Sequence, residues 1–471
     1  MADRALWTSP EAEAATGGRS SEPWSANGVS IDTRTLKPGD LYIAIKGDSL
    51  DGHDYVDAAF TNQAAAAVVS QASTVKGKPA LIVADTFAAL NALGAAARER
   101  TGARIAAITG SVGKTSTKEA LRFVLEKQGE TAATTGNLNN HWGVPLSLSR
   151  MRPQVAYGVF EMGMNSPGEI SPLSRLVRPH VALITTIAPA HIEFFESLGE
   201  VADAKAEIFD GMEGGVAILN RDNAYFPTLA VAAHGRKLDR VMGFGAHPEA
   251  TARLLDAELD SDGSDVTAEI DGHRIAYRIG QPGRHWIINS LGVLAAASAL
   301  GAELVAAARA LADVPQAKGR GERIRVQLAG GPIELIDDSY NASPASMRAA
   351  IETLSQFTPE HGGRRIVAFG DMLELGPRSP ELHAGLADIL VACDVDLVFT
   401  AGPEMAHLAE ALPKAMRGAH ADDSAALAKR LTGQLRPGDV ITVKGSLGSR
   451  MAVVVEALIA LGAPQQTAVN G

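Results

Sequence analysis

The chain has 471 residues, a formal net charge of −11, and a composition that is 46% hydrophobic and 21% charged. This length gives room for two to four domains with their own cores, and the composition is that of an ordinary soluble globular protein. The acidic balance argues against nonspecific binding to nucleic acid or to an anionic membrane surface.

The first residues, MADRALWTSPEAEAATGG, have neither the basic start nor the apolar core of a secretory signal. No run reaches the roughly 18 apolar residues that a membrane span requires. The single cysteine, Cys393, cannot form an internal disulfide. These features predict a cytoplasmic protein with no membrane span and no nucleic-acid partner.

The first segment, residues 1–95, contains short strand-like runs at 41–45 and 65–70. A turn-rich loop with glycines at 47 and 52 lies between them. This pattern predicts a small α/β domain.

The second segment, residues 96–316, opens with a short apolar run at 104–109 that has the length of a buried strand. Further buried strands are expected at 155–161, 181–187 and 216–219, with helices between them. Apolar strands that alternate with helices favour a parallel sheet covered on both faces. Asp-Gly at 271–272, between two strand-like runs, predicts an antiparallel hairpin beside this sheet.

The third segment, residues 317–471, follows a glycine-containing and charged stretch that suits an interdomain hinge at Gly319 and Gly321. Two Ser-Pro pairs, at 343–344 and 379–380, predict the starts of helices. The segment is expected to form a second α/β domain, with strands at 333–337, 365–369, 395–400 and 439–443. No strand is followed by G-x-G-x-x-G, so the dinucleotide-binding pattern is absent.

A glycine-rich loop follows the strand at 104–109 and precedes a helix. The glycines allow backbone N–H groups to turn toward phosphate oxygens, and the helix N-terminus adds a favourable dipole. Lys114 can reach the β- and γ-phosphates, and Thr115 can hold a magnesium ion. The usual pattern needs glycine at 108, where this chain has Ile108, and a chance glycine-rich turn is the alternative. We interpret the loop as an ATP site made by Gly110, Ser111, Val112, Gly113, Lys114, Thr115 and Ser116.

Two further residues are expected at the same edge of the sheet. Glu161 ends an apolar strand, and His191 follows the strand at 181–187. Groups at the carboxyl ends of parallel strands face the ligand crevice. Each residue alone is more simply a solvated glutamate or a structural histidine. Together they predict an Mg²⁺ site next to the phosphate loop.

Lys205 lies within the apolar stripe of a helix expected at 200–212. A lysine on a buried face must pair, lose its charge or extend its head to solvent. Beside a metal–phosphate site, a lysine carbamylated by CO2 would instead become an anion that ligates or orients magnesium. The spacing leaves these alternatives open.

Several motifs occur in an order and spacing that resemble those of the Mur ligase family over nearly the whole chain. They are TGSVGKTSTKE, TTGNLNNHWGVPLSL, EMGMNSPGEI, APAHIEFFESL, ADAKAEIF, GRHWIINSLGVLAAAS, DDSYNASP and VKGSLGSRM. The resemblance implies an α/β protein of three domains: a small UDP-binding domain at 1–95, a central P-loop ATPase domain with a parallel sheet at 96–316, and a C-terminal Rossmann-like domain at 317–471. It also implies an amide ligase that uses ATP and Mg²⁺ and forms an acyl phosphate.

Within the family, GDMLELG at 370–376 and DDSYNASP are most similar to the branch that joins D-alanyl-D-alanine to UDP-N-acetylmuramoyl-tripeptide. The DNPR-type motif of the branch that adds a diamino acid is absent. The resemblance therefore implies these two reactants and a monomeric enzyme. Trp286 is a departure, because it lies at a place where the family more often reads His-Asn.

Three other functions are alternatives. A folylpolyglutamate synthetase-like ligase should lack a first domain of about 95 residues. A P-loop GTPase should carry N-K-x-D, which is absent. A noncatalytic nucleotide-binding protein would not be expected to keep Lys114, Glu161, His191 and Lys205.

The resemblance also implies a role for each residue that matches a motif. Lys114 and carbamylated Lys205 would be catalytic. Thr115, Glu161 and His191 would ligate Mg²⁺, and Asn289 and Asn341 would lie near the adenine and ribose of ATP. The substrate-binding candidates are Ser30, Arg34, Lys46, Asn137, Asn139 and Asn140 for the UDP-linked peptide, and Asp371, Glu374, His383, Lys444 and Ser446 for D-alanyl-D-alanine.

Overall fold

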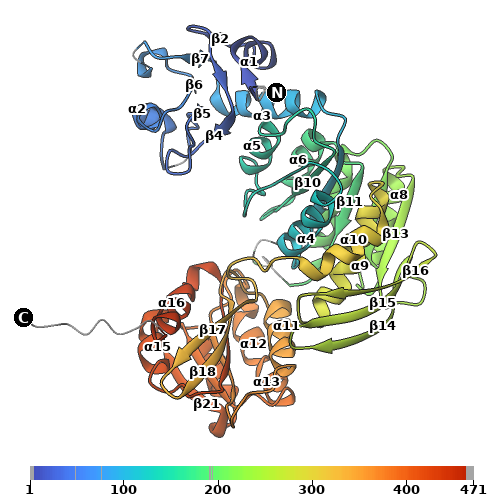
Figure 1. Cartoon of the computed structure of the whole chain (residues 1–471), viewed down its shortest axis with the longest axis vertical. Helices are drawn as coiled ribbons and strands as arrows, with labels where there is room; N and C mark the ends of the chain where they lie inside the picture. The colour runs from blue at the N-terminus through green and yellow to red at the C-terminus, as the bar shows by residue number, and fades with distance from the viewer. Residues whose placement is uncertain (1–4, 48, 76, 190–192, 194, 463–471) are drawn as a thin grey trace, which may run out of the picture.

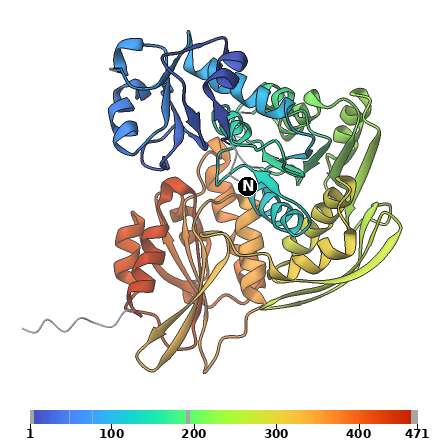
Figure 2. The same ribbon diagram turned by 45° about the horizontal axis from the view of Figure 1, so that its top comes forward.

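The chain forms three successive α/β parts, each built on its own sheet (Figure 1). The computed structural model describes residues 5–47, 49–75, 77–189, 193 and 195–462. After a turn of the view, the N-terminal, central and C-terminal parts are seen to surround a common centre (Figure 2). This arrangement confirms the predicted α/β class with parallel-rich sheets.

The N-terminal sheet has parallel strands from β4 to β7, and β2 is antiparallel at its edge. In spatial order its strands are β2 (Arg19–Ser20), β7 (Ala80–Ile82), β6 (Ala66–Val69), β5 (Asp40–Ile43) and β4 (Gly28–Ser30). The other elements of this part are α1 (Ser9–Thr16), α2 (Val56–Thr61), α3 (Thr86–Glu99) and the small pair β1 (Trp7–Thr8) and β3 (Ser25–Ala26). The strands expected at 41–45 and 65–70 correspond to β5 and β6.

The central sheet is parallel from β9 to β14 and antiparallel from β14 to β16. In spatial order its strands are β16 (His273–Ile279), β15 (Gly263–Ile270), β14 (Ala252–Asp260), β13 (Arg240–Gly245), β12 (Val216–Asn220), β11 (Val181–Ile184), β8 (Arg104–Thr109), β10 (Tyr157–Glu161) and β9 (Thr131–Ala133). All four strands expected before residue 220 are present, and the one expected at 181–187 ends at Ile184.

Helices cover both faces of this sheet, and a separate apolar core lies on each face. Helices α4 (Lys114–Glu126), α9 (Arg284–Ala299) and α10 (Leu304–Ala310) pack together on one side. The opposite side carries α5 (Gly143–Ser149), α6 (Ile170–Val177), α7 (Leu198–Ala206) and α8 (Phe226–Gly235). Glu161, at the end of β10, and the loop that follows β8 line a cavity together with residues of the C-terminal part.

The predicted hairpin is confirmed between β15 and β16. Asp271 and Gly272 form its turn with φ angles of +53° and +80°. Positive φ at both central positions is typical of the hairpin turn whose twist matches that of the strands, and Asp-Gly is a preferred pair there.

The C-terminal sheet has the spatial order β17 (Glu322–Leu328), β18 (Gly331–Asp338), β22 (Val440–Lys444), β19 (Arg365–Gly370), β20 (Leu397–Ala401) and β21 (Arg417–Ala421). Only β17 is antiparallel to its neighbour. The helices are α11 (Pro344–Ser355), α12 (Ser379–Ala384), α13 (Ala387–Ala392), α14 (Met405–Ala411), α15 (Ser424–Leu431) and α16 (Ala452–Ala460).

The two Ser-Pro pairs behave differently. Ser343 caps α11, because its hydroxyl accepts the backbone N–H of Ser346 at 3.4 Å. Ser379 is the first residue of α12, which Arg378 precedes as the cap position, and the Ser379 side chain faces the ring of His383. The prediction of a helix start at each pair is correct, but the serine caps its helix only at the first pair.

The domain boundaries at 95/96 and 316/317 stay predictions. The first lies within α3, which contacts α1 and β6 on one side and α5 and α6 on the other. Near the second, Gly319 and Gly321 have φ angles of +72° and +88°. Among the described residues, no helix is both long and apolar enough to cross a membrane.

Candidate active site

The glycine-rich loop connects the end of β8 to the first turn of α4. Gly110 and Gly113 have φ angles of +145° and +85°, which L side chains rarely adopt, and a Cβ at Gly110 would collide with Thr185. The Thr185 hydroxyl donates to the carbonyl of Val112 at 2.6 Å, and the amide of Ser111 donates to Thr186 at 2.8 Å. The end of β11 therefore fixes the shape of the loop.

Lys114 folds back over its own loop. Its Nζ donates to the carbonyl oxygens of Gly110 at 2.6 Å and of Ser111 at 3.4 Å. Burial lowers the pKa of Lys114, while the negative charge of Glu161 acts in the opposite direction. The positive charge of Lys114 is thus held beside the N-terminus of α4, where an anion would relieve the cost of its burial.

Glu161, the last residue of β10, is 1% exposed. Its Oε1 accepts hydrogen bonds from the Thr115 hydroxyl at 3.2 Å and from the Asn139 amide at 2.8 Å. Its Oε2 is buried, with no hydrogen-bond partner among the described residues. An unpaired buried carboxylate oxygen is costly, and a bound cation would compensate for it.

Oxygen atoms of a carboxylate and a threonine hydroxyl are ligands that Mg²⁺ prefers, so Glu161 and Thr115 fit this ion. His191, the third expected ligand, lies outside the described residues. The described part of the chain has no group of three or more His, Cys, Asp or Glu placed to hold a metal. Among the described residues, the proposed Mg²⁺ ligands are therefore two, Glu161 and Thr115.

Lys205 lies near the end of α7 and is 3% exposed. Burial, together with the positive charge of Lys114, holds the pKa of Lys205 well below its ordinary value. Because the side chain of Lys205 is almost fully covered, its ammonium does not reach bulk solvent. The alternative in which Lys205 extends its charged head to solvent is therefore disfavoured. The expectation of one helix over 200–212 is wrong in its bounds, because α7 ends at Ala206 and a 3-10 helix follows at Glu207–Gly211.

A cavity of about 660 Å³ lies between the central and C-terminal parts. This volume is in the range of sites for small molecules and cofactors. Most of the residues predicted to bind ATP line it, as do several of the substrate candidates. They are Ser111, Val112, Gly113, Lys114, Thr115, Ser116, Asn289 and Asn341, with Glu161, Asn137, Asn139, Glu374, Lys444 and Ser446.

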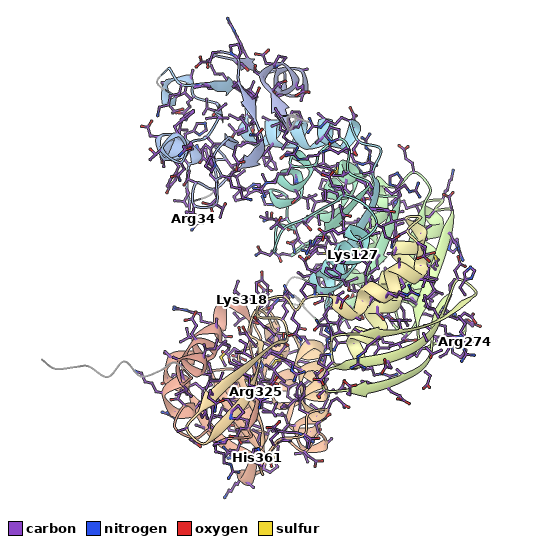
Figure 3. The ribbon with its side chains drawn as sticks, viewed as in Figure 1. Arg34, Lys127, Arg274, Lys318, Arg325 and His361 are labelled. Carbon is purple, nitrogen blue, oxygen red and sulfur yellow. The ribbon has the colours of Figure 1, made fainter. Side chains whose placement is uncertain are left out.

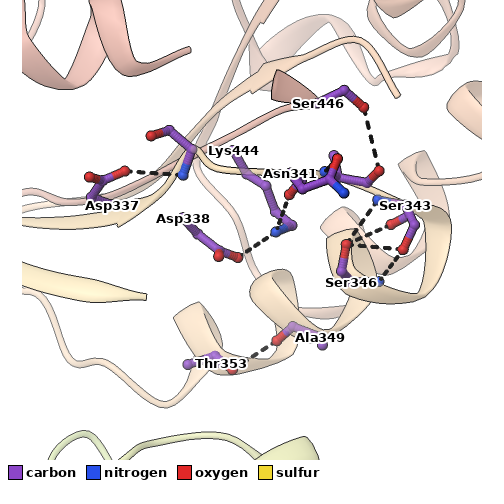
Figure 4. A network of polar contacts seen from close by, with 11 residues as sticks. Asp337, Asp338, Asn341, Ser343, Ser346, Ala349, Thr353, Lys444 and Ser446 are labelled. Atoms are coloured by element: carbon purple, nitrogen blue, oxygen red, sulfur yellow. Dashed lines mark hydrogen bonds and ion pairs between the residues drawn. The ribbon is translucent and has the colours of Figure 1, made fainter. Parts of the chain in front are cut away.

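The C-terminal wall of the cavity is a polar network around Lys444, at the end of β22 (Figure 4). The ammonium of Lys444 donates to Asp338 at 2.6 Å and to the carbonyl of Asn341 at 2.9 Å. Burial raises the pKa of Asp338, and the charge of Lys444 opposes this shift. Lys444 therefore fixes the loop that carries Asn341 against the cavity.

Of the substrate candidates in the central and C-terminal parts, three do not line the cavity and instead make structural contacts. Asn140 accepts the amide of Gly143 at 2.9 Å, at the start of α5. Asp371 accepts the amide of Met405 at 2.8 Å, at the start of α14. His383 is fully buried, and its ring faces the amide of Met372 at 3.0 Å and the carbonyl of Ser379 at 2.7 Å.

The candidates in the N-terminal part lie apart from this cavity. Ser30 is buried and its hydroxyl donates to the carbonyl of Asp32 at 3.0 Å. Arg34 is 87% exposed at its side chain and pairs with Asp32 at 2.6 Å, and Lys46 is also exposed. Figure 3 shows Arg34 on the edge of the N-terminal part that faces Lys318, across the centre of the molecule.

Other residues of the cavity wall were not singled out from the sequence. Arg320 lies over the ring of Tyr340, with its guanidinium carbon 4.2 Å from the ring centroid, and both residues line the cavity. Asp338 lines it as well, and so does Trp286, which the sequence singled out only as a departure from the family. The charge of Arg320 between the two hinge glycines was the available signal, since a cation at a domain junction suits an anionic ligand.

Comparison with known proteins identifies the family of all three parts. Three family models match: Mur ligase family, catalytic domain, over residues 25–107; Mur ligase middle domain, over 108–297; and Mur ligase, glutamate ligase domain, over 319–447. A UDP-N-acetylmuramoyl-tripeptide–D-alanyl-D-alanine ligase of Escherichia coli (strain K12) is 38% identical over 433 residues, which are 91% of this chain and 93% of that protein.

Solved structures agree with this comparison. A crystal structure of MurF from Acinetobacter baumannii matches with a TM-score of 0.84 and 30% identity, over 96% of this chain and 99% of that one. MurF ligase from Thermotoga maritima in complex with ADP matches with a TM-score of 0.75 and 27% identity, over 92% and 97%. The chain therefore belongs to the Mur ligase family.

Proposed function

We propose that this protein is the ATP-dependent ligase that joins D-alanyl-D-alanine to UDP-N-acetylmuramoyl-tripeptide during peptidoglycan precursor synthesis. Relatives at 34–38% identity that carry this activity in their names support the proposal, since each covers more than nine-tenths of the chain. ATP use is supported by the phosphate loop and by the MurF ligase bound to ADP. A monomeric state and a cytoplasmic location belong to the same proposal.

The reaction begins at the terminal carboxylate of the tripeptide. One of its oxygens attacks the γ-phosphorus of ATP, the bond from that phosphorus to the β–γ bridging oxygen breaks, and ADP leaves. The amine of D-alanyl-D-alanine then attacks the carbonyl carbon of the acyl phosphate. The bond from that carbon to the phosphate oxygen breaks, the nitrogen releases one proton to solvent, and an amide and inorganic phosphate remain.

In this proposal Lys114 binds the β- and γ-phosphates. Its ammonium already lies over the phosphate loop, where it donates to the carbonyl oxygens of Gly110 and Ser111. Glu161 and Thr115 would hold Mg²⁺, with His191 as a further ligand. When bound, this ion would neutralise charge on the phosphate oxygens. Asn289 and Asn341 would contact the nucleoside from opposite walls of the cavity.

Lys205 is proposed to be carbamylated. Its lowered pKa favours the neutral amine, which is the form whose nitrogen bonds to CO2 with release of one proton. The product is an anion, and an anion beside Lys114 would replace the repulsion between the two lysines with attraction. Carbamylation would also remove the cost of burying a positive charge at this position.

The remaining candidates divide between the two substrates. Asn137 and Asn139 line the cavity beside Glu161 and are proposed to contact the peptide end of the UDP-linked substrate. Ser30, Arg34 and Lys46 are proposed for its UDP end. Glu374, Lys444 and Ser446 are proposed to contact D-alanyl-D-alanine, whereas Asn140, Asp371 and His383 would act by shaping the loops that carry such contacts.

One observation carries the proposal further than the others. The unpaired Oε2 of Glu161 lies beside the phosphate loop, at a cavity whose opposite wall comes from another part of the chain. ATP bound at the loop, the tripeptide carboxylate beside Glu161 and D-alanyl-D-alanine held by the C-terminal part would meet there. This is the arrangement that transfer to a second substrate requires.

We expect the purified protein to release inorganic phosphate from ATP only when UDP-N-acetylmuramoyl-tripeptide and D-alanyl-D-alanine are both present. Each substrate alone should give a rate close to that of ATP by itself, because the acyl phosphate needs the first and turnover needs the second. A coupled phosphate assay with single and paired substrates measures this. Equal release with folate and L-glutamate would instead favour the folylpolyglutamate synthetase-like alternative and contradict the proposal.

A further inference from the structure

Lys118 is a buried lysine that the proposed reaction does not use. It lies on α4, one turn after Thr115, and is 0% exposed. Its ammonium forms an ion pair with Glu119 and donates to the carbonyl oxygen of Thr134 at 2.9 Å. Lys118 does not line the cavity. Since a charge is costly to bury even when it is paired, the place of Lys118 on the helix that follows the phosphate loop points to a role that solvent-exposed lysines do not have.

Thr134 connects Lys118 to Glu161. Thr134 follows β9 directly and is 1% exposed. Its hydroxyl accepts the backbone N–H of Glu161 at 3.1 Å, and its own N–H donates to the carbonyl of Val159 at 3.1 Å. Thr134 therefore helps to fix the last residue of β10 from the side of β9, while Ile108 of β8 pairs with that residue on the other side.

Glu161 is thus held at two levels. Thr115 and Asn139 hold its carboxylate, and Thr134 holds its backbone. Lys118 fixes Thr134 to the same helix that carries Thr115. A shift of Thr134 relative to α4 would change the separation between the two groups proposed to bind Mg²⁺.

We propose that Lys118 is a positioning residue for the metal site: through Thr134 it sets the place of Glu161 relative to Thr115. This inference rests on the proposed function, because it takes Glu161 and Thr115 as magnesium ligands. Residues that orient metal ligands commonly change metal affinity by 10- to 100-fold when replaced. Loss of Lys118 should therefore weaken metal binding more than it weakens nucleotide binding.

The test uses Mn²⁺ as a paramagnetic substitute for Mg²⁺. Its dissociation constant is measured by electron paramagnetic resonance, with the full-length protein and a saturating nonhydrolysable ATP analogue. The variants are Lys118→Met, which keeps an apolar stem, and Thr134→Val, which removes only the hydroxyl contact. Thr134→Ser keeps that hydroxyl, and Lys127→Met removes an exposed lysine just after α4.

We expect Lys118→Met and Thr134→Val each to raise the dissociation constant of Mn²⁺ by about tenfold or more. Thr134→Ser and Lys127→Met should stay within about twofold of the unsubstituted protein. The double variant, with both Lys118→Met and Thr134→Val, should have about the same dissociation constant for Mn²⁺ as the single variant that binds Mn²⁺ less tightly. Both substitutions act through the same chain of contacts, so their effects should not add.

A folded Lys118→Met variant with unchanged Mn²⁺ affinity would overturn the inference. Should that variant fail to fold, unchanged affinity in Thr134→Val would overturn it equally. Absence of Mn²⁺ binding by the unsubstituted protein would contradict both the magnesium site and this inference. Normal Mn²⁺ binding without phosphate release from the paired substrates would contradict the proposed function alone.

Discussion

Replacement of Lys114 by methionine is expected to lower kcat by about 1000-fold, with the protein still folded. A positioned charge that stabilises a reacting oxygen contributes on the order of 100- to 1000-fold, and Lys114 is proposed to contact both the β- and γ-phosphates. Methionine keeps the length of the stem and removes the ammonium that now bonds Gly110 and Ser111. Steady-state phosphate release with all three substrates saturating measures the change.

Lys127→Met is the matched control, because it removes a lysine from the exposed end of the same helix. That variant should keep kcat within about twofold of the unsubstituted protein, as expected for a surface substitution. Thermal unfolding should show that Lys114→Met is at least as stable as the unsubstituted protein, since the substitution removes a partly buried charge. A Lys114→Met variant with more than a tenth of the original kcat would contradict the role given to this residue.

The second large effect is expected at Lys205. Lys205→Ala should lower kcat by about 100-fold or more, because it removes the anion proposed to hold the metal site. Short carboxylates such as formate or acetate should restore part of the activity, since they can occupy the space of the missing carbamate. The measurement is kcat as a function of carboxylate concentration.

The same account predicts that the unsubstituted protein loses activity when CO2 and bicarbonate are removed, most strongly at low pH. At a pH below its lowered pKa, Lys205 would be protonated and unable to bond CO2, and above that pKa it would be neutral and reactive. Full activity of Lys205→Ala without added carboxylate would reject the carbamate.

Local patterns predicted the centre of the molecule well. The run from Arg104 to Ser116 gives a strand, a turn and a helix start within thirteen positions, and glycines at positive φ leave few alternatives there. The end of β10 at Glu161 was likewise predictable, because a short apolar run that stops at a charged residue is typical of a buried strand.

The end of α7 depended on a distant contact. Apolar spacing continues past Ala206, yet the carboxylate of Glu207 accepts backbone amides from Gly168 at 2.6 Å and Ile170 at 3.1 Å, at the start of α6. The chain tightens into a 3-10 helix where Glu207 makes these bonds. Such a contact between segments almost forty residues apart leaves no periodic signal.

Motif resemblance located loops better than it located functional side chains. His383 lies in a motif with a distinctive pattern, and the structure shows its ring bonded on both sides by backbone groups. Burial lowers the pKa of His383. Its Nε2 accepts the backbone N–H of Met372, so Nδ1 carries the proton and donates to the carbonyl of Ser379. A residue that shapes a loop and one that contacts substrate are equally recognisable in the sequence, and only the three-dimensional contacts separate them.

The central claim is that the γ-phosphate of ATP activates the carboxylate of the tripeptide at the loop from Gly110 to Ser116. Its most direct test uses UDP-N-acetylmuramoyl-tripeptide labelled with ¹⁸O in the terminal carboxylate. Because the oxygen that attacks phosphorus leaves with it, each amide bond should yield one inorganic phosphate carrying one ¹⁸O, as measured by mass spectrometry. Amide formation with unlabelled phosphate would contradict an acyl-phosphate mechanism and, with it, the use proposed here for the loop.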